Sequence, residues 1–562
     1  MIINSAIVTV LKLAATLLLP AVLLTGCGKN DSLQKGETPA EQGNESAESD
    51  AYDQVIADLN EVIRLNPNDA SAYFERGEAY QNKSDIDLAI ADYNEAIRLN
   101  PDYVEAYSNR GWAYGRVKGD LDRAVADLNE AIRLDPDNAV AYSSRGVAYY
   151  NKRDYDLAIA DYNEAIRLDP NNAVAYSNRG DVHRVKGDHD RAVEDLNEAI
   201  RLDPDNAVAY NNRGYAYYNK GDYDRAITDY SQVIRLESDN AVAYSNRGVA
   251  YYSKGDPDRA IADYSQVIRL ESDNAAAYSN RGDVYRMKGN YNRAIADYNQ
   301  VIRLESDNAV AYNNRGNVYR ARGDYDRAIA DYDQAIHLNS DFATAYNNRG
   351  VAYDKKGDSD RAIADYSEAI RLNSKHAEAY NNRGIAYYNK GDFDQAIANY
   401  NDAIRLNPNL VTTYNSRGYA YYNKGDFDQA VADYTQAIRL NLDYVEAYNN
   451  RGVAYDKKGD FDRAIASYSQ AIYLSPKYAE AYNNRGIAYY NKGDFDQAIA
   501  NYNDAIRLNP NYADAYYSRG IAYGDKGDLD RAVADYEAAL RINPDNTIFI
   551  KVLEATGDSR IR

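Results

Sequence analysis

The sequence is poor in the residues that build most catalytic and metal centres. Its 562 residues include one cysteine, four histidines, two methionines and one tryptophan. A single cysteine cannot form an internal disulfide, and no cysteine or histidine spacing typical of a zinc site occurs. The chain also lacks H-E-x-x-H, G-x-S-x-G and glycine-rich phosphate-loop motifs. We therefore expect a protein that is not an enzyme, has no cofactor and no metal, and is stabilised by packing alone.

Positive charge is scarce as well. Lysine and arginine together number 65, against 86 aspartates and glutamates, and the net charge is −21. Because nucleic-acid backbones are bound by clustered lysine and arginine, this balance predicts no nucleic-acid partner. An anionic bilayer would repel the same charge, so attachment to a membrane requires a hydrophobic or covalent anchor.

Such an anchor is indicated near the N-terminus. A twelve-residue apolar run, LAATLLLPAVLL at 13–24, follows Lys12. It is too short to span a bilayer but suits the apolar core of a secretory signal. The next residues, Leu24-Thr25-Gly26-Cys27, resemble the bacterial lipobox, in which signal peptidase cuts before a cysteine that carries lipid. The resemblance implies a lipoprotein signal peptide over 1–26 and lipid attachment at Cys27; an uncleaved anchor with an incidental cysteine is the alternative.

The segment that follows the cysteine is polar and acidic. Residues 27–51 contain almost nothing that could be buried, so we expect a disordered tether between the lipid and the folded body. Gly28 stands where some inner-membrane lipoproteins carry aspartate. The expected location is therefore the bacterial cell envelope, with the periplasmic face of the outer membrane favoured and a surface-exposed location left open.

The body of the chain is a repeat. One glycine recurs every 34 residues, with a single interval of 35, at positions 77, 111, 146, 180, 214, 248, 282, 316, 350, 384, 418, 452, 486 and 520. The extra residue falls within 115–120, which we expect to be the turn between two helices. Three repeats were also copied as a block, because residues 377–409 are identical to 479–511.

Each repeat predicts two helices. In the unit 207–240, Tyr210, Gly214 and Tyr217 share one face of a first helix, and Gly221 supplies a stop. The second helix has its own apolar face, made of Ala226, Ile227, Tyr230, Val233 and Ile234. A mid-helix glycine costs about 0.5–1 kcal/mol relative to alanine. Its recurrence predicts that the two helices cross too closely at Gly214 for a Cβ.

These residues and offsets resemble the tetratricopeptide repeat (TPR) family, with glycine, tyrosine, alanine and proline at the expected places of a 34-residue unit. The resemblance implies an all-α TPR superhelical solenoid of about 14 helix-turn-helix repeats over 70–546. A half repeat at 52–69 is expected to form the N-terminal capping helix, and 547–562 the C-terminal cap, because a solenoid needs closed ends.

The residue before the repeated glycine departs from the family pattern. It is arginine in every repeat, where TPRs usually carry an apolar residue. An aspartate follows the glycine by 15 or 16 residues in most repeats, as Asp229 does, and Asn399, Ser467 and Asn501 replace it in three. We predict a structural row of arginine–aspartate pairs; the alternative is an arginine row that binds an anionic ligand.

A second row of positions varies from repeat to repeat. Positions −6, −3, +1 and +4 relative to the glycine fall on one side of the first helix, and we expect them to be exposed. The resemblance implies that they line a concave groove for protein partners, such as peptide segments. The candidate groove residues are Tyr150, Tyr218, Tyr252, Tyr388, Tyr422, Tyr490, Arg184, Arg286, Arg320, Glu378, Glu446 and Glu480.

The leading hypothesis is a non-enzymatic protein–protein interaction scaffold, anchored in the bacterial envelope through Cys27. Two alternatives remain: a spacer lipoprotein associated with cell wall or glycan, and a regulatory subunit of an envelope enzyme complex. A row of tyrosine and asparagine side chains suits an adaptable binding surface, but the same row could be an ordinary solvated face.

Overall fold

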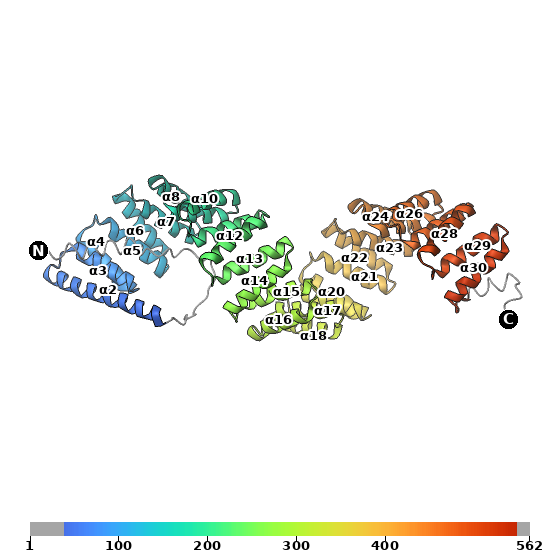
Figure 1. Ribbon diagram of the computed structural model, residues 1–562, viewed down its shortest axis with the longest axis horizontal. Helices are drawn as coiled ribbons and strands as arrows, with labels where there is room; N and C mark the ends of the chain where they lie inside the picture. The colour runs from blue at the N-terminus through green and yellow to red at the C-terminus, as the bar shows by residue number, and fades with distance from the viewer. Residues whose placement is uncertain (1–38, 548–562) are drawn as a thin grey trace. The chain divides into compact units, whose positions relative to one another are not determined.

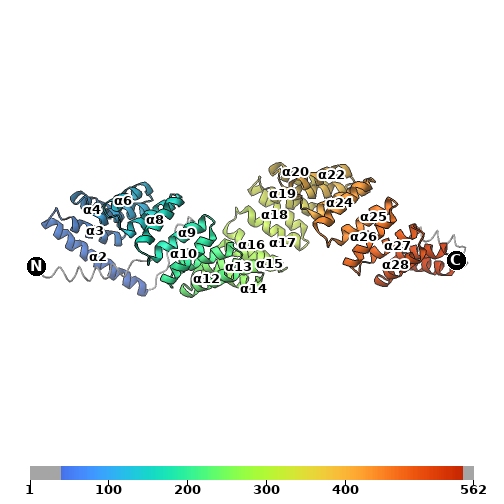
Figure 2. The same cartoon turned by 90° about the horizontal axis from the view of Figure 1, so that it is seen from above.

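The computed structural model describes residues 39–547, with side chains from residue 51 onward. All regular secondary structure in this range is helical, and the predicted all-α fold is confirmed. The chain divides into two compact units, Met1–Lys288 and Gly289–Arg562. Within each unit, antiparallel helix pairs stack one after another (Figures 1 and 2).

A first helix and a second helix alternate along each unit, and α2 (Pro39–Leu65) precedes them. The first unit continues with α3 (Ala70–Asn82), α4 (Ile86–Leu99), α5 (Val104–Trp112), η1 (Ala113–Lys118), α6 (Leu121–Leu134), α7 (Ala139–Asn151), α8 (Tyr155–Leu168), α9 (Ala173–Val185), α10 (His189–Leu202), α11 (Ala207–Asn219), α12 (Tyr223–Leu236), α13 (Ala241–Lys254), α14 (Pro257–Leu270) and α15 (Ala275–Met287). The second unit contains α16 (Tyr291–Leu304), α17 (Ala309–Ala321), α18 (Tyr325–Leu338), α19 (Ala343–Lys355), α20 (Ser359–Leu372), α21 (Ala377–Asn389), α22 (Phe393–Leu406), α23 (Val411–Lys424), α24 (Phe427–Leu440), α25 (Val445–Lys457), α26 (Phe461–Leu474), α27 (Ala479–Asn491), α28 (Phe495–Leu508), α29 (Ala513–Asp525) and α30 (Leu529–Ile542).

Local sequence explains where the helices begin and end. Gly221 closes the turn after α11 with φ 78°, which glycine adopts without strain. Asp222 then caps α12, because its side chain accepts a hydrogen bond from the backbone N–H of Arg225. Asn206 caps α11 in the same way through the N–H of Ala209.

The repeated glycine lies where the two helices of a repeat cross. A Cβ added at Gly214 would stand 2.9 Å from Cε1 of Tyr230, a ring that is itself buried in α12. The predicted close crossing is confirmed. Packing also continues from one repeat to the next, since Val233 of α12 and Ala243 of α13 share one buried cluster.

Within each unit, the first helices of neighbouring repeats lie closer to one another than the second helices do. Neighbouring first helices contact one another, as α9 and α11 do, or α21 and α23. Neighbouring second helices make no comparable contact in the described part of the chain. The first helices therefore lie on the inner side of each unit, and the second helices lie on its outer side.

Two boundaries differ from the prediction. Helix α2 begins at Pro39, so residues 39–51 are helical and are not part of a disordered tether, and the N-terminal helix does not start at Tyr52. The segment is rich in alanine and glutamate, which favour helix, and proline suits the first helical position. The extra residue of the 35-residue interval is taken up by η1, a π-helical turn at the end of a first helix, and not by a longer loop.

Several predicted segments lie outside the described residues. They are the signal peptide, Cys27, the tether as far as residue 38, and residues 548–562 of the C-terminal cap. Between residues 39 and 547, no helix is long and apolar enough to cross a membrane.

Candidate functional site

The arginine before each glycine pairs with the predicted aspartate. In the repeat of α11 and α12, Nε of Arg213 donates to Oδ2 of Asp229 at 2.8 Å, and Nη2 donates to Oδ1 at 2.6 Å. The predicted pairs are present as Arg76–Asp92, Arg110–Asp127, Arg145–Asp161, Arg179–Asp195, Arg213–Asp229, Arg247–Asp263, Arg315–Asp331, Arg349–Asp365, Arg417–Asp433 and Arg519–Asp535.

The same arginine reaches a third helix. Nη1 of Arg213 donates to Oδ1 of Asn197 in α10, which belongs to the preceding repeat, at 2.8 Å. Its guanidinium also lies 5.3 Å from the ring centre of Tyr210, within cation–π range. Arginine thus joins both helices of its own repeat to the repeat before it. These engaged guanidinium groups are structural and do not form a row open to an anionic ligand.

The surface that varies is the inner side of the first helices. We call the residues at −6, −3, +1 and +4 of the first helices the first-helix face. Its −6 residues are exposed apart from the half-buried Val208, and they include Glu378, Glu446 and Glu480. Of the predicted +4 tyrosines, Tyr252 is exposed, whereas Tyr150, Tyr218, Tyr388, Tyr422 and Tyr490 are half-buried.

Hydrogen bonds to the next repeat hold most of these tyrosines. The hydroxyl of Tyr218 lies 3.0 Å from Oγ of Ser253, and the amide of Asn423 donates to the hydroxyl of Tyr388 at 2.9 Å. Tyr150 donates to Oδ2 of Asp181 at 2.8 Å. The rings are therefore fixed in place, and these hydroxyl groups already have partners within the chain.

The −3 residues are less exposed than the sequence suggested. Asn347 is only 1% exposed, and Asn449 is buried as well. Neighbouring first helices pack close enough for amides to bond across them, as Asn484 does when it donates to Asn449 at 3.2 Å. The expectation that all four positions are exposed is therefore wrong at −3, because the adjacent first helix covers that position.

The predicted groove arginines are paired within the face. Arg184 lies 2.7 Å from Asp181 and stacks over Tyr215, with its guanidinium carbon 4.9 Å from the ring centre. Arg286 lies 3.3 Å from Asp283, and Nη2 of Arg320 donates to Oδ1 of Asn317 at 3.5 Å. On the first-helix face of the first unit, Arg184 and Arg286 therefore neutralise the charges of Asp181 and Asp283.

The second unit is different in charge. From α19 to α29 no lysine or arginine occupies the four positions of the face, whereas six acids do: Asp354, Glu378, Glu446, Asp456, Glu480 and Asp514. Burial raises the pKa of Asp354 and of Asp456. Oδ1 of Asp354 is buried without a hydrogen-bond partner in the described residues.

One member of an aromatic cluster on the same face, Tyr419, was not singled out from the sequence. The ring centre of Tyr419 in α23 lies 5.6 Å from the ring centre of Tyr388 and 6.4 Å from that of Tyr422. Tyr419 is 45% exposed. The available signal was the +1 position, which is tyrosine only at Tyr215 and Tyr419. We call Tyr388, Tyr419 and Tyr422 the Tyr419 cluster.

Comparison with known protein families agrees with this architecture. Models described as "TPR repeat" match residues 43–84, 83–117, 116–153, 180–221, 214–255, 250–289, 282–319, 316–357 and 386–425. Models described as "tetratricopeptide repeat" match 139–172, 161–194, 343–376, 366–398, 415–479 and 483–547. The chain belongs to the tetratricopeptide-repeat family. TPR solenoids are in general non-catalytic and present extended surfaces to protein or peptide partners.

Solved structures of other TPR proteins are similar to this one. MamA is 33% identical in sequence, with a TM-score of 0.28 and coverage of 29% of this chain and 96% of that chain. YrrB, described as a TPR protein with an unusual peptide-binding site, is 23% identical, with a TM-score of 0.29 and coverage of 34% and 97%. Yeast Tom70 is 19% identical, with a TM-score of 0.33 and coverage of 75% and 95%. No curated protein matches the chain.

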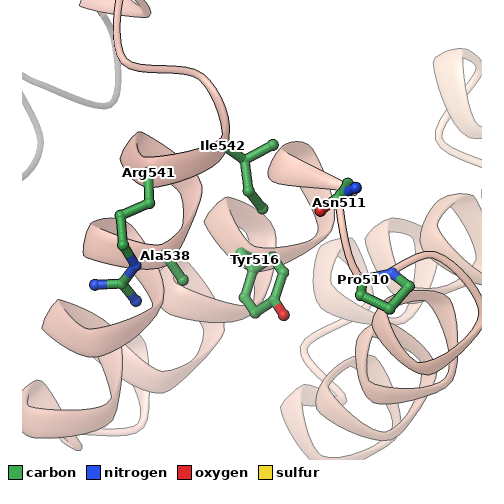
Figure 3. Close-up of a pocket in the computed structure, with 6 residues that line it drawn as sticks. All are labelled: Pro510, Asn511, Tyr516, Ala538, Arg541 and Ile542. Atoms are coloured by element: carbon green, nitrogen blue, oxygen red, sulfur yellow. The ribbon is translucent and has the colours of Figure 1, made fainter.

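One pocket of the TPR array lies away from the first-helix face, at the end of the last repeat. It measures about 600 Å³ and is lined by Pro510, Asn511, Tyr516, Ala538, Arg541 and Ile542 (Figure 3). Tyr516 comes from α29, and Ala538, Arg541 and Ile542 come from α30. Within the described range, no group of three or more histidine, cysteine, aspartate or glutamate side chains could hold a metal ion.

Proposed function

We propose that this TPR protein is a lipid-anchored scaffold of the bacterial envelope that holds extended protein segments against its first-helix face. The observation that carries the proposal is the contrast within each repeat. The arginine and glycine that build the repeat recur throughout, together with a buried tyrosine that only Leu128 and Leu196 replace, whereas the first-helix face changes from paired charges and valine to exposed acids and aromatic rings.

The rigidity of this face supports the same function. Tyr218 and Tyr388 are fixed by hydrogen bonds to the following repeat. A partner that binds a preformed ring does not have to order it, so less conformational entropy is lost on association. Tyrosine offers a large contact area with few rotatable bonds. The anchoring half of the proposal is supported by the sequence around Cys27 and by the apolar run that precedes it.

Site-specific photo-crosslinking in living cells tests the binding half. A probe at Tyr218 or Tyr388 should give a recurrent protein adduct, identified by mass spectrometry. A probe at Ala398, an exposed position of second helix α22, is the matched control. Equal adducts from Ala398 and Tyr388, or no protein adduct from either, would contradict the proposal and favour a spacer associated with cell wall or glycan.

Substitution of Cys27 tests the anchoring half. Cys27→Ala should move the protein from the membrane fraction to the soluble fraction and abolish labelling by a fatty-acid precursor. A stable lipid anchor generally requires more than one acyl chain. All of these chains would be attached through Cys27, so its loss should release the protein from the membrane. If Cys27→Ala stayed in the membrane fraction, the lipoprotein assignment would be wrong.

A further inference from the structure

The first unit shows what an exposed +1 tyrosine of this repeat contacts. Tyr215 of α11 is 41% exposed, and the guanidinium of Arg184, at +4 of the preceding repeat, lies 4.9 Å from the ring centre. This distance is within cation–π range, and the planar guanidinium suits stacking on an aromatic face. The carboxylate of Asp181 lies 2.7 Å from Nη2 of the same guanidinium. An aromatic ring and a carboxylate together hold one guanidinium.

The second unit carries the same exposed +1 tyrosine without the arginine and without the aspartate, because Ile385 stands in the place of Asp181. Tyr419 of α23 occupies the same +1 position, and the +4 residue of the preceding repeat is Tyr388 in place of arginine. Tyr419 contacts the rings of Tyr388 and Tyr422, and no arginine or lysine of the described residues lies over it. Tyr419 therefore receives no guanidinium from its own chain, and it remains 45% exposed beside the two rings.

The rings around Tyr419 are held rigidly. The amide of Asn423 donates to the hydroxyl of Tyr388 at 2.9 Å and to the backbone oxygen of Tyr419 at 2.8 Å. Phe393 packs 5.5 Å from Tyr388, and Phe427 packs 5.4 Å from Tyr422, between ring centres. The cluster is therefore preformed, and binding would need little rearrangement of the chain.

Carboxylates stand near the cluster as well. Burial, then Tyr419 and then the charge of Asp456, at +4 of α25, raise the pKa of the Tyr422 phenol, so Asp456 acts on this ring. Glu378 and Glu446 are exposed on the first helices α21 and α25, to either side of α23. No basic residue occupies the face between α19 and α29. This charge complements a cation and disfavours an anionic partner.

We propose that the Tyr419 cluster binds an arginine side chain of an extended partner segment, placing its guanidinium over Tyr419 as Arg184 lies over Tyr215. This inference rests on the proposed function and names the partner chemistry that one part of the first-helix face selects. The partner is a protein segment that carries arginine, and its guanidinium would be shared between the rings and the neighbouring carboxylates.

Binding of a defined peptide to the full-length protein in detergent tests the inference. The probe is a fluorescent glycine–serine dodecapeptide with three arginines, and its matched control replaces each arginine with citrulline, which is similar in shape but uncharged. Tyr419→Leu should weaken binding of the arginine peptide about fivefold, the upper end of the loss expected for one exposed cation–π contact. Tyr419→Phe should stay within about twofold, because the ring face remains. Both variants keep the charge of the protein, so general attraction to its acidic surface is unchanged.

Two further variants give each unit the tyrosine environment that the other unit has. Tyr388→Arg should supply the chain's own guanidinium to Tyr419 and weaken the arginine peptide. Arg184→Leu should uncover Tyr215 and add a second binding site in the first unit. Thermal unfolding of every variant establishes that the repeats remain folded.

The outcomes separate this inference from the proposed function. Unchanged binding to Tyr419→Leu, or equal binding of the citrulline peptide, would overturn the inference. A protein adduct at Tyr388 in cells whose crosslinked segment contains no arginine would also overturn it while leaving the scaffold function intact. Selective loss of the arginine peptide from folded Tyr419→Leu would support it.

Discussion

Arg213 binds both carboxylate oxygens of Asp229 and also the side-chain oxygen of Asn197 in the preceding repeat. One side chain of α11 is thereby connected to α12 and α10. The side chain of Asp229 is 4% exposed and that of Arg213 is 17% exposed. Removing one member of such a buried pair leaves the other charge uncompensated, which is far more costly than removing both.

The first prediction concerns this pair. Asp229→Ala and Arg213→Leu should each lower the free energy of unfolding by about 3 kcal/mol, and the double variant should lose less than the two single losses added together. Hydrogen exchange of α11 and α12 measures the effect, because repeat arrays open locally. If Asp229→Ala left exchange unchanged and Arg213→Leu slowed it, the pair would not stabilise the repeat.

The second prediction concerns the one repeat in which serine replaces the aspartate. Nε of Arg451 donates to Oγ of Ser467 at 3.2 Å, and burial lowers the pKa of this arginine. Ser467→Asp should create the arginine–aspartate pair seen in most repeats and raise the stability of α25 and α26 by about 1.5–3 kcal/mol, the range of a hydrogen bond to a charged group. Hydrogen exchange of these two helices measures the change.

The matched control is Ser467→Asn, because Asn501 stands at the equivalent position of a later repeat and accepts from Nε of Arg485 at 2.7 Å. It offers Arg451 an acceptor without adding charge, so it should stabilise the repeat less than Ser467→Asp does. A loss of stability in Ser467→Asp would mean that the desolvation of the new carboxylate exceeds its attraction to Arg451.

The interior of each repeat could be predicted from the sequence because its contacts join two helices of the same repeat. The close crossing at Gly214 and the pairing of Arg213 with Asp229 both follow from helical geometry and a constant offset. The bond from Arg213 to Asn197 was missed because it depends on how neighbouring repeats stack. The burial of Asn347 was missed for the same reason, since a helical wheel contains no adjacent helix.

The candidate site was harder to predict, because its distinctive residues occur in one repeat at a time. Tyr419 is exposed and aromatic where half of the repeats carry an aliphatic residue, so a consensus does not reveal it. The sequence suggested that Arg184 has no partner within the chain, but its guanidinium pairs with Asp181 and stacks on Tyr215. The helical start at Pro39 was missed because low hydrophobicity was taken to exclude structure, although the segment continues a helix that packs through Ile56, Leu59 and Ile63.

The third prediction concerns a strained turn. Arg153 has φ 65° at the position where most repeats place a glycine with positive φ, such as Gly187 at 80°. A left-handed conformation costs a residue with a Cβ about 1–2 kcal/mol. Arg153→Gly should therefore stabilise α7 and α8 by about 1 kcal/mol, as measured by hydrogen exchange of the two helices, and Gly187→Arg should destabilise α9 and α10 by a similar amount. Equal stability of Arg153→Gly and the parent chain would show that the turn relaxes without cost.

The fourth prediction uses the pH dependence of stability. Burial raises the pKa of Asp354, although a hydrogen bond from Asn389 and the charge of Lys355 oppose the shift. An acid whose pKa is higher in the folded state than in the unfolded chain destabilises the fold when it is ionised. That cost disappears as the pH falls through the folded pKa and the carboxyl takes up a proton. Asp354→Asn should therefore unfold at a higher temperature than the parent chain at pH 7, and the difference should shrink toward pH 4.

Asp222 provides a control of opposite sign. The backbone N–H of Arg225 and then its side chain lower the pKa of Asp222, so its ionised form stabilises the folded state above its ordinary pKa of about 3.9. Asp222→Asn should be less stable than the parent chain at pH 7, and its deficit should shrink as the pH falls through the lowered pKa. Thermal unfolding of the three proteins between pH 3 and 7 measures both differences, and the other carboxylates cancel because all three chains share them. A difference between Asp354→Asn and the parent chain that is constant over this range would mean that Asp354 titrates at the same pH folded and unfolded, and that its burial in α19 does not penalise the charge.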